Sequence, residues 1–202
     1  MKRRNPASAS GGEVRVIGGT LRGRKLPFPA APGLRPTPDR VRETLFNWLA
    51  PVIREARCLD LFAGSGALGV EALSRGAREV VFVDRHAPAL AALQGSLQRF
   101  AVAPQACPCI QAEALPWLRQ AQGPFDVVFI DPPFDLGLQP QVLAALADPA
   151  PKGLLAPGAW VYVEQPRADP APLLPAGWRL HRQGTAGDVG YYLLQSHDTD
   201  VS

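Results

Sequence analysis

The chain has 202 residues, of which 47% are hydrophobic and 19% are charged. This composition fits one folded domain and excludes a disordered chain, and no apolar run is long enough to predict a transmembrane helix. Residues 1–57 hold 12 Lys+Arg and 4 Asp+Glu, a net charge of +8, whereas residues 58–202 hold 9 and 14, a net charge of −5.

The basic front end is predicted to form a small extension. Residues 1–13 are expected to be a disordered tail, followed by a short strand over residues 14–17 and a returning strand within residues 20–29. A basic segment joined to an acidic body favours contact with a polyanion such as a nucleic acid, although a solvated basic tail would give the same pattern.

A helix is predicted to close this extension, which then spans residues 14–50. Thr37-Pro38-Asp39 is a helix-start signal, in which the threonine hydroxyl caps the helix and the proline takes its first position. The apolar residues that follow recur at helical spacing and predict one buried face: Val41, Leu45, Trp48 and Leu49.

From residue 57 onwards strands and helices alternate, which predicts an α/β fold with a doubly wound, mostly parallel sheet. The strand over residues 125–131 is apolar almost throughout and is therefore expected at the centre of the sheet. Only residues 183–190 separate the last two strands, so these two strands are expected to be antiparallel, and the last strand of a seven-stranded sheet is expected to be antiparallel. The predicted strands cover residues 58–62, 79–84, 107–112, 125–131, 159–164, 178–182 and 191–195. The predicted helices run up to residue 75 and over residues 87–100, 113–122 and 139–147, and residues 196–202 are expected to be a disordered tail.

A glycine-rich turn, Gly64-Ser65-Gly66-Ala67-Leu68-Gly69, follows the first strand of this sheet, and Asp84 ends the next strand. Ligands of open parallel sheets lie at the carboxyl ends of the strands. Glycines let the backbone approach a ligand, and a carboxylate can accept hydrogen bonds from both hydroxyls of a ribose. These residues predict a site for an adenosine-containing cofactor.

The charge of Asp60 distinguishes between two classes of candidate cofactor. It lies in the strand just before the glycine turn, where its negative charge would repel the pyrophosphate of a dinucleotide. The same carboxylate suits S-adenosylmethionine, whose sulfonium and amine outweigh its one carboxylate. The alternative for Asp60 is a structural role, as a cap on the turn over residues 64–69.

The segment Asp131-Pro132-Pro133-Phe134 directly follows the central strand. Its two prolines end the strand and stiffen the backbone. The Asp131 carboxylate and a free backbone carbonyl then form two adjacent acceptors that match the exocyclic NH2 group of a nucleobase, and the Phe134 ring can stack on that base. A rigid loop over a packed aromatic ring is the alternative interpretation.

Cysteine and histidine usage predicts neither disulfides nor a metal site. Three cysteines, an odd and small number, argue against a disulfide framework and favour the cytoplasm. The spacing of the cysteines and histidines matches no zinc-ligand pattern: Cys58, Cys107, Cys109, His86, His181 and His197.

Several segments together resemble a known family. Asp60, residues 62–66, Asp84 and residues 131–134 are similar to the ordered motifs of class I S-adenosylmethionine-dependent methyltransferases, within the group that acts on exocyclic nitrogens. Residues 15–19, 22–26 and 35–49 resemble the bacterial 16S ribosomal RNA (guanine(966)-N(2))-methyltransferase family. The resemblance covers about residues 14–195 and implies a Rossmann-like methyltransferase domain over residues 51–195.

The resemblance implies an enzyme that methylates the N2 amine of a guanine in 16S ribosomal RNA, within the small ribosomal subunit or its assembly intermediate. It implies catalytic roles for Asp131, Pro132, Pro133 and Phe134. The cofactor-binding residues it implies are Asp60, Phe62, Ala63, Gly64, Gly66, Asp84, Arg85, Ala112, Glu113 and Asp131. Glu113 stands where an aspartate is common in the family. A monomer is expected, since nothing demands an oligomer.

The basic extension is expected to hold RNA phosphates. The candidate residues are Arg15, Arg22, Arg24, Lys25, Arg40 and Arg42. For Arg40 and Arg42 the alternative is ion pairing on an exposed helix face, where Arg40 and Glu43 are three residues apart.

Three other functions stay open from the residues alone. A DNA adenine-N6 or cytosine-N4 methyltransferase shares the Asp131–Phe134 pattern but normally needs a sizeable target-recognition region, for which this chain has little room. A dinucleotide-dependent oxidoreductase shares the glycine turn. A non-catalytic RNA-binding protein could use the same fold.

Overall fold

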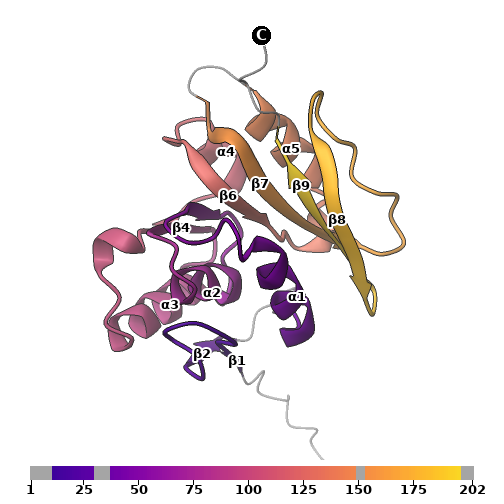
Figure 1. The fold of residues 1–202 in the computed structure, drawn as a ribbon. Coiled ribbons are helices and arrows are strands. Elements are labelled where there is room, and N and C mark those ends of the chain that lie inside the picture. Colours follow the sequence, from indigo (N-terminus) through magenta and orange to yellow (C-terminus); the bar gives the residue numbers. More distant parts are fainter. Residues whose placement is uncertain (1–10, 30–36, 149–152, 197–202) are drawn as a thin grey trace, which may run out of the picture.

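A computed structural model describes residues 11–29, 37–148 and 153–196 of the chain (Figure 1). The strands are β1 (Gly12–Arg15), β2 (Lys25–Phe28), β3 (Arg57–Asp60), β4 (Glu79–Asp84), β5 (Cys109–Gln111), β6 (Phe125–Ile130), β7 (Leu155–Pro166), β8 (Arg179–Ala186) and β9 (Val189–Gln195). The helices are α1 (Asp39–Leu49), α2 (Ala67–Ser74), α3 (Ala87–Arg99), α4 (Ala114–Leu118) and α5 (Gln139–Ala147). Two 3-10 turns are η1 (Pro104–Ala106) and η2 (Phe134–Leu136).

The main sheet has seven strands in the order β5-β4-β3-β6-β7-β9-β8. β4 pairs in parallel with β5 and β3, and β6 pairs in parallel with β3 and β7. β9 is antiparallel to both of its neighbours, β7 and β8. The predicted α/β class, the mostly parallel sheet and the antiparallel last strand are therefore confirmed, and β6 is the central strand.

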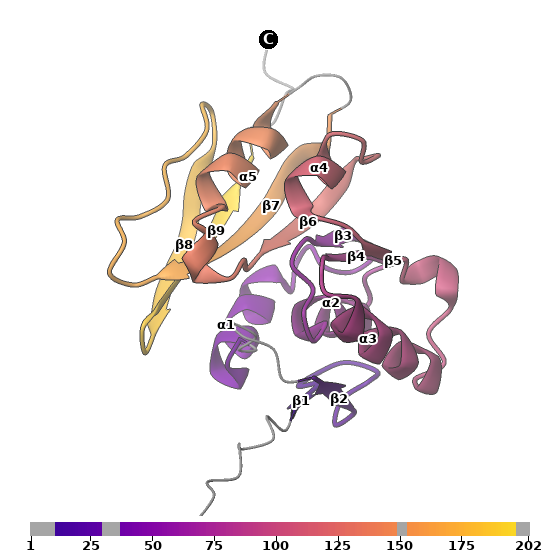
Figure 2. The same cartoon turned by 180° about the vertical axis from the view of Figure 1, so that it is seen from behind.

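Helices cover both faces of this sheet. α1, α2 and α3 lie on one face, and α4 and α5 lie on the other, as the two opposite views show (Figures 1 and 2). Phe46 of α1 packs against Phe129 of β6 with ring centroids 5.9 Å apart. No helix in the described ranges is both long enough and apolar enough to cross a membrane.

The amino-terminal hairpin begins earlier than predicted. Gly12 and Glu13 pair with Phe28 and Pro27, so these two residues belong to β1 and not to a tail over residues 1–13. At the other end, the Ser196 N–H donates to the Ala159 carbonyl at 2.8 Å, so Ser196 belongs to the fold. The rest of the two predicted tails, residues 1–10 and 197–202, lies outside the described residues.

The segment that joins β1 to β2 is held against α2. Glu71 of α2 is fully buried, and its two carboxylate oxygens accept hydrogen bonds from the Ile17 and Gly18 N–H groups, each at 2.8 Å. The Leu21 N–H donates to the Ser74 hydroxyl at 2.9 Å. The extension and the sheet thus pack against each other through α2, the helix that follows the glycine turn.

The strands near the carboxyl terminus are longer than predicted. β7 runs over Leu155–Pro166, whereas the sequence pattern predicts only residues 159–164. Pro157 and Gly158 interrupt the apolar pattern, but residues on both sides of them pair with β6. β8 extends to Ala186 because its pairing with β9 continues to the end of the hairpin.

Candidate functional site

Three aspartates lie at one edge of the sheet. Asp60 ends β3, Asp84 ends β4 and Asp131 directly follows β6, so the carboxyl ends of three neighbouring parallel strands bring them together. Among the described residues, no lysine or arginine lies within 4.0 Å of any of these carboxylates. This edge therefore suits a ligand that carries positive charge.

Asp60 supports the glycine turn from below. Its side chain is buried, and its Oδ2 accepts a hydrogen bond from the Gly69 N–H at 3.0 Å. Burial raises the pKa of Asp60 to about 7, with the Gly69 hydrogen bond opposing and the nearby Asp84 adding to that shift. The structural role considered as the alternative is thus present in the structure, and a contact of Asp60 with the cofactor stays a proposal.

Asp84 joins the turns that follow β3 and β4. Its Oδ2 accepts a hydrogen bond from the Gly64 N–H at 2.7 Å, and its Oδ1 accepts one from the His86 N–H at 2.8 Å. Each carboxylate oxygen has lone pairs for a further donor, so a ribose hydroxyl can bind in addition. Gly66 has a φ of 76°, and a Cβ there would collide with Leu93, so only glycine fits this position.

The other candidate cofactor residues surround the same edge. Phe62 packs partly buried against the α4 and α5 side of the core, and the Ala63 N–H donates to the Val83 carbonyl at 2.9 Å. The Ala112 N–H donates to the Asp84 carbonyl at 3.0 Å, which places Glu113 beside the end of β4. Arg85 and Glu113 are exposed. Contacts of these residues with a cofactor stay predictions.

The loop after β6 keeps its two predicted acceptors at the surface of the site. Asp131 is partly buried, and Phe134, the first residue of η2, is 37% exposed. Within the described residues, no N–H group donates to the Pro132 carbonyl, whereas the Pro133 carbonyl accepts the Leu136 N–H at 3.1 Å. The Pro132 oxygen is therefore available for an external donor.

Thr37 does not cap α1, contrary to the sequence prediction. The helix begins at Asp39, its N-cap is Pro38, and no side chain caps it. The Thr37 hydroxyl instead donates to Asp131 Oδ2 at 3.3 Å. The chain passes the end of β6 as it enters α1, so the hydroxyl binds a carboxylate 94 residues away.

Glu164 is a further acidic residue beside Asp131 that the sequence pattern did not single out. It is 2% exposed, and the Tyr162 hydroxyl donates to its Oε1 at 2.8 Å. Burial raises the pKa of Glu164, and burial followed by the adjacent Glu164 carboxyl group raises the pKa of Asp131. The sequence feature that could have identified Glu164 is a carboxyl group at the end of a predicted apolar strand.

Five of the six predicted RNA-binding residues are exposed: Arg15, Arg22, Arg24, Lys25 and Arg40. Lys25 forms an exposed ion pair with Glu13 at 2.8 Å.

The prediction for Arg42 is wrong, because its side chain is fully buried and faces α2. Arg42 donates to the Arg15 carbonyl at 2.9 Å and to Asp39 Oδ1 at 2.7 Å, and lies 3.6 Å from Glu71. It therefore holds the extension together and is not available to a phosphate.

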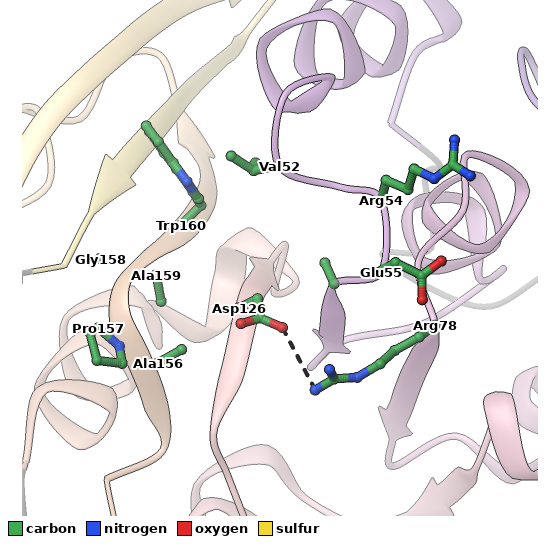
Figure 3. Close-up of a pocket in the computed structure, with 11 residues that line it drawn as sticks. Val52, Arg54, Glu55, Arg78, Asp126, Ala156, Pro157, Gly158, Ala159 and Trp160 are labelled. Atoms are coloured by element: carbon green, nitrogen blue, oxygen red, sulfur yellow. Dashed lines mark ion pairs between the residues drawn. The ribbon is translucent and has the colours of Figure 1, made fainter.

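A pocket of about 390 Å³ lies away from these residues (Figure 3). It is lined by Arg54, Arg78, Asp126 and Trp160 among others, near the amino-terminal ends of β3 and β6, and contains the Arg78–Asp126 ion pair at 3.9 Å. The three aspartates lie at the opposite ends of these strands. This pocket is therefore not the site that the aspartates define.

Comparisons with known proteins identify a family and several relatives of this chain. The family described as conserved hypothetical protein 95 matches residues 14–195. A relative from Escherichia coli strain K12, named ribosomal RNA small subunit methyltransferase D, is 46% identical over 192 residues, which cover 95% of this chain and 94% of that protein. The protein of the same name from Haemophilus influenzae is 44% identical and covers 92% of this chain and 95% of its own. The solved structure of yhhF from Escherichia coli matches with a TM-score of 0.84 and 44% identity, over 93% of this chain and 100% of that one.

Proposed function

The chain belongs to the conserved hypothetical protein 95 family, and from this premise we propose that it methylates the N2 amine of a guanine in 16S ribosomal RNA. It is a class I methyltransferase that uses S-adenosylmethionine and acts on ribosomal RNA. The small ribosomal subunit or its assembly intermediate is the proposed substrate particle, and a monomer is the proposed active form.

The observation that carries this proposal is the pair of acceptors after β6. The Asp131 carboxylate and the Pro132 carbonyl, which accepts a hydrogen bond from no N–H group of the described residues, lie next to each other in a backbone stiffened by two prolines. An exocyclic amine has two N–H donors, and this pair can accept both. The exposed Phe134 ring beside them gives the purine a surface on which to stack.

The residues present fit the cofactor. S-adenosylmethionine supplies, when bound, an electrophilic methyl group on a positively charged sulfur. The three carboxyl groups of Asp60, Asp84 and Asp131 have no cationic partner in the described ranges, which suits the positive charges of this cofactor. Asp84 would bind the ribose hydroxyls, and Asp60 with the turn over residues 62–66 would bind the methionine end.

Asp131 acts on the amine through position and charge. The guanine N2 lone pair is delocalised into the ring, so the amine is a weak nucleophile. Hydrogen bonds from its two N–H groups to Asp131 and to the Pro132 carbonyl favour a pyramidal nitrogen and stabilise the positive charge that develops on it. The amine proton becomes acidic as the new bond forms, and it leaves to Asp131 or to water.

The extension supplies the proposed RNA contacts, and residues 51–195 supply the methyl-transfer site. Arg22 and Arg24 are exposed on the segment that α2 holds in place, Arg15 is exposed at the end of β1, and Arg40 is exposed on α1. Positive charges on an extension that is held in place can fix the phosphate backbone while the target base leaves its stack.

The test uses the purified chain, labelled S-adenosylmethionine and small ribosomal subunits, with mass mapping of the product. Wild-type protein is expected to add one methyl group to the N2 atom of a guanine, and Asp131→Ala is expected to abolish transfer while cofactor binding persists. Duplex DNA serves as the alternative substrate. Nicotinamide dinucleotide serves as the alternative cofactor, and its binding is compared with that of S-adenosylmethionine. Turnover of DNA, or largely intact activity of Asp131→Ala, would show that the proposal is wrong.

A further inference from the structure

A second carboxyl group lies beside the one that faces the substrate amine. β6 and β7 pair in parallel up to Ile130 and Val163, so the next residues, Asp131 and Glu164, lie at the same level of the sheet. Glu164 is buried, and no lysine or arginine of the described ranges lies within 4.0 Å of it. Two neighbouring carboxylates without a cation are costly to ionise together, so the pair retains a proton.

Each carboxyl group of the pair accepts a hydrogen bond from a hydroxyl. The Thr37 hydroxyl donates to Asp131 Oδ2 at 3.3 Å. The Tyr162 hydroxyl donates to Glu164 Oε1 at 2.8 Å.

Exposure indicates which of the two carboxyl groups holds the proton. Glu164 is 2% exposed, whereas Asp131 is only partly buried. The charged form is therefore less costly on Asp131 than on Glu164. The other titratable groups that act on the pair are Asp60 of β3, whose charge acts on Asp131, and Tyr191 of β9, whose charge acts on Tyr162.

We propose that Glu164 is held as a neutral carboxylic acid, and that Glu164 and Thr37 are positioning residues that keep Asp131 ionised and directed at the substrate amine. This inference rests on the proposed function. Glu164 and Thr37 act on the amine only through Asp131 and are not proposed to contact it. The Thr37 hydroxyl binds Oδ2 of Asp131, and Oδ1 remains for the substrate.

The same contacts tie the RNA-binding extension to the site. Thr37 precedes α1, and its carbonyl accepts a hydrogen bond from the buried Arg42 Nε at 3.2 Å. Arg42 also donates to the Arg15 carbonyl of β1 at 2.9 Å. The extension therefore supplies one of the groups that orient Asp131, in addition to its basic surface.

The first test removes and restores the Thr37 hydroxyl. Thr37→Val keeps the side-chain volume and removes the donor to Asp131, so kcat on small subunits is expected to fall about tenfold to a hundredfold. Because the lost donor favoured the charged form, the acid limb of the kcat profile moves to higher pH. KM for the subunits and affinity for S-adenosylmethionine change little, and Thr37→Ser restores most of kcat. A lower kcat with an unmoved acid limb would assign the hydroxyl a packing role only.

The second test separates a neutral acid from a carboxylate. Glu164→Gln reproduces the neutral acid, since its amide is uncharged and its carbonyl can accept from the Tyr162 hydroxyl, so it recovers most of the kcat that Glu164→Ala loses. If Glu164→Gln is as impaired as Glu164→Ala, the negative charge is required and the inference is overturned. Thermal unfolding of each variant identifies misfolding, and Thr37→Val decides the question where Glu164→Ala does not fold.

Two controls separate this inference from the proposed function. Glu79→Gln, at the amino-terminal end of β4 and 26% exposed in its side chain, is expected to leave the pH profile unmoved. An inactive wild-type protein, or an active Asp131→Ala, would reject the proposed function. An active wild-type protein with unmoved profiles in the Thr37 and Glu164 variants would reject only this inference.

Discussion

Replacing Glu71 by alanine is expected to detach the extension from α2 and to destabilise the whole protein. Glu71 is fully buried, accepts two backbone hydrogen bonds at 2.8 Å from Ile17 and Gly18, and pairs with Arg75 at 2.8 Å. Arg42, which is also fully buried, lies 3.6 Å away. The substitution leaves two backbone donors without their acceptor and removes the buried carboxylate beside Arg42, a change that costs about 3–5 kcal/mol.

The assay is equilibrium unfolding in urea together with thermal unfolding. A loss of this size corresponds to a fall in Tm of about 6–20 °C for a chain of this length. Hydrogen exchange of residues 11–28 is expected to accelerate in the variant, since these residues lose their attachment. Glu79→Ala is the matched control, because its ion pair with Arg57 is partly exposed and contributes at most about 1 kcal/mol. If Glu71→Ala costs no more than this control, the buried network does not hold the extension.

Three further predictions concern the site and its substrate. Phe134→Ala is expected to raise KM for small subunits and lower kcat with little change in Tm, since the ring is 37% exposed, and a steady-state assay beside an unfolding curve checks this. Charge reversal of Arg22 and Arg24 together is expected to weaken RNA binding and reduce its salt dependence, measured by filter binding at several salt concentrations; unchanged affinity would assign the segment a structural role only. Affinity for S-adenosylmethionine is expected to rise as pH rises through about 7. Burial raises the pKa of Asp60 to that value, and a cationic ligand favours the ionised form. Calorimetry measures this affinity, which should not depend on pH in this range for Asp60→Asn.

The raised pKa of Asp60 also determines how folding stability changes with pH. Its pKa is raised from 3.8 to about 7 in the folded state, so folding favours the neutral form. The contribution of Asp60 is fully present below the lower value and is lost as pH rises toward the higher one. A ligand that stabilises the charged form opposes this loss, so the cofactor should protect the protein most at and above neutral pH.

The fold and the row of candidate site residues at the ends of the strands could be predicted because both depend on local sequence patterns. The bounds of α5 and β4 agree with the sequence patterns, since each element carries an unbroken period of its own. The residues that follow β3, β4 and β6 are recognisable because parallel strands bring their carboxyl ends to one edge.

The contacts that support the site were not predictable in this way. Thr37 stands in a good capping position, and only the tertiary structure shows that its hydroxyl binds Asp131 instead. Arg42 lies in a charged stretch typical of a solvated helix, yet its partner Glu71 comes from a different helix. Glu164 is isolated in its strand, and its neighbour Asp131 follows another strand. Local spacing contains no information about such pairs.

The atom that receives the methyl group tests the roles of Asp131 and the Pro132 carbonyl most directly. Small ribosomal subunits that lack the modification are incubated with the purified chain and isotopically labelled S-adenosylmethionine, and the RNA is digested and mapped by mass spectrometry. The expected result is one labelled methyl group on the N2 atom of one guanine in 16S ribosomal RNA, absent with Asp131→Ala. A label on a ring nitrogen, a ribose or an adenine would contradict the roles assigned to Asp131 and the Pro132 carbonyl.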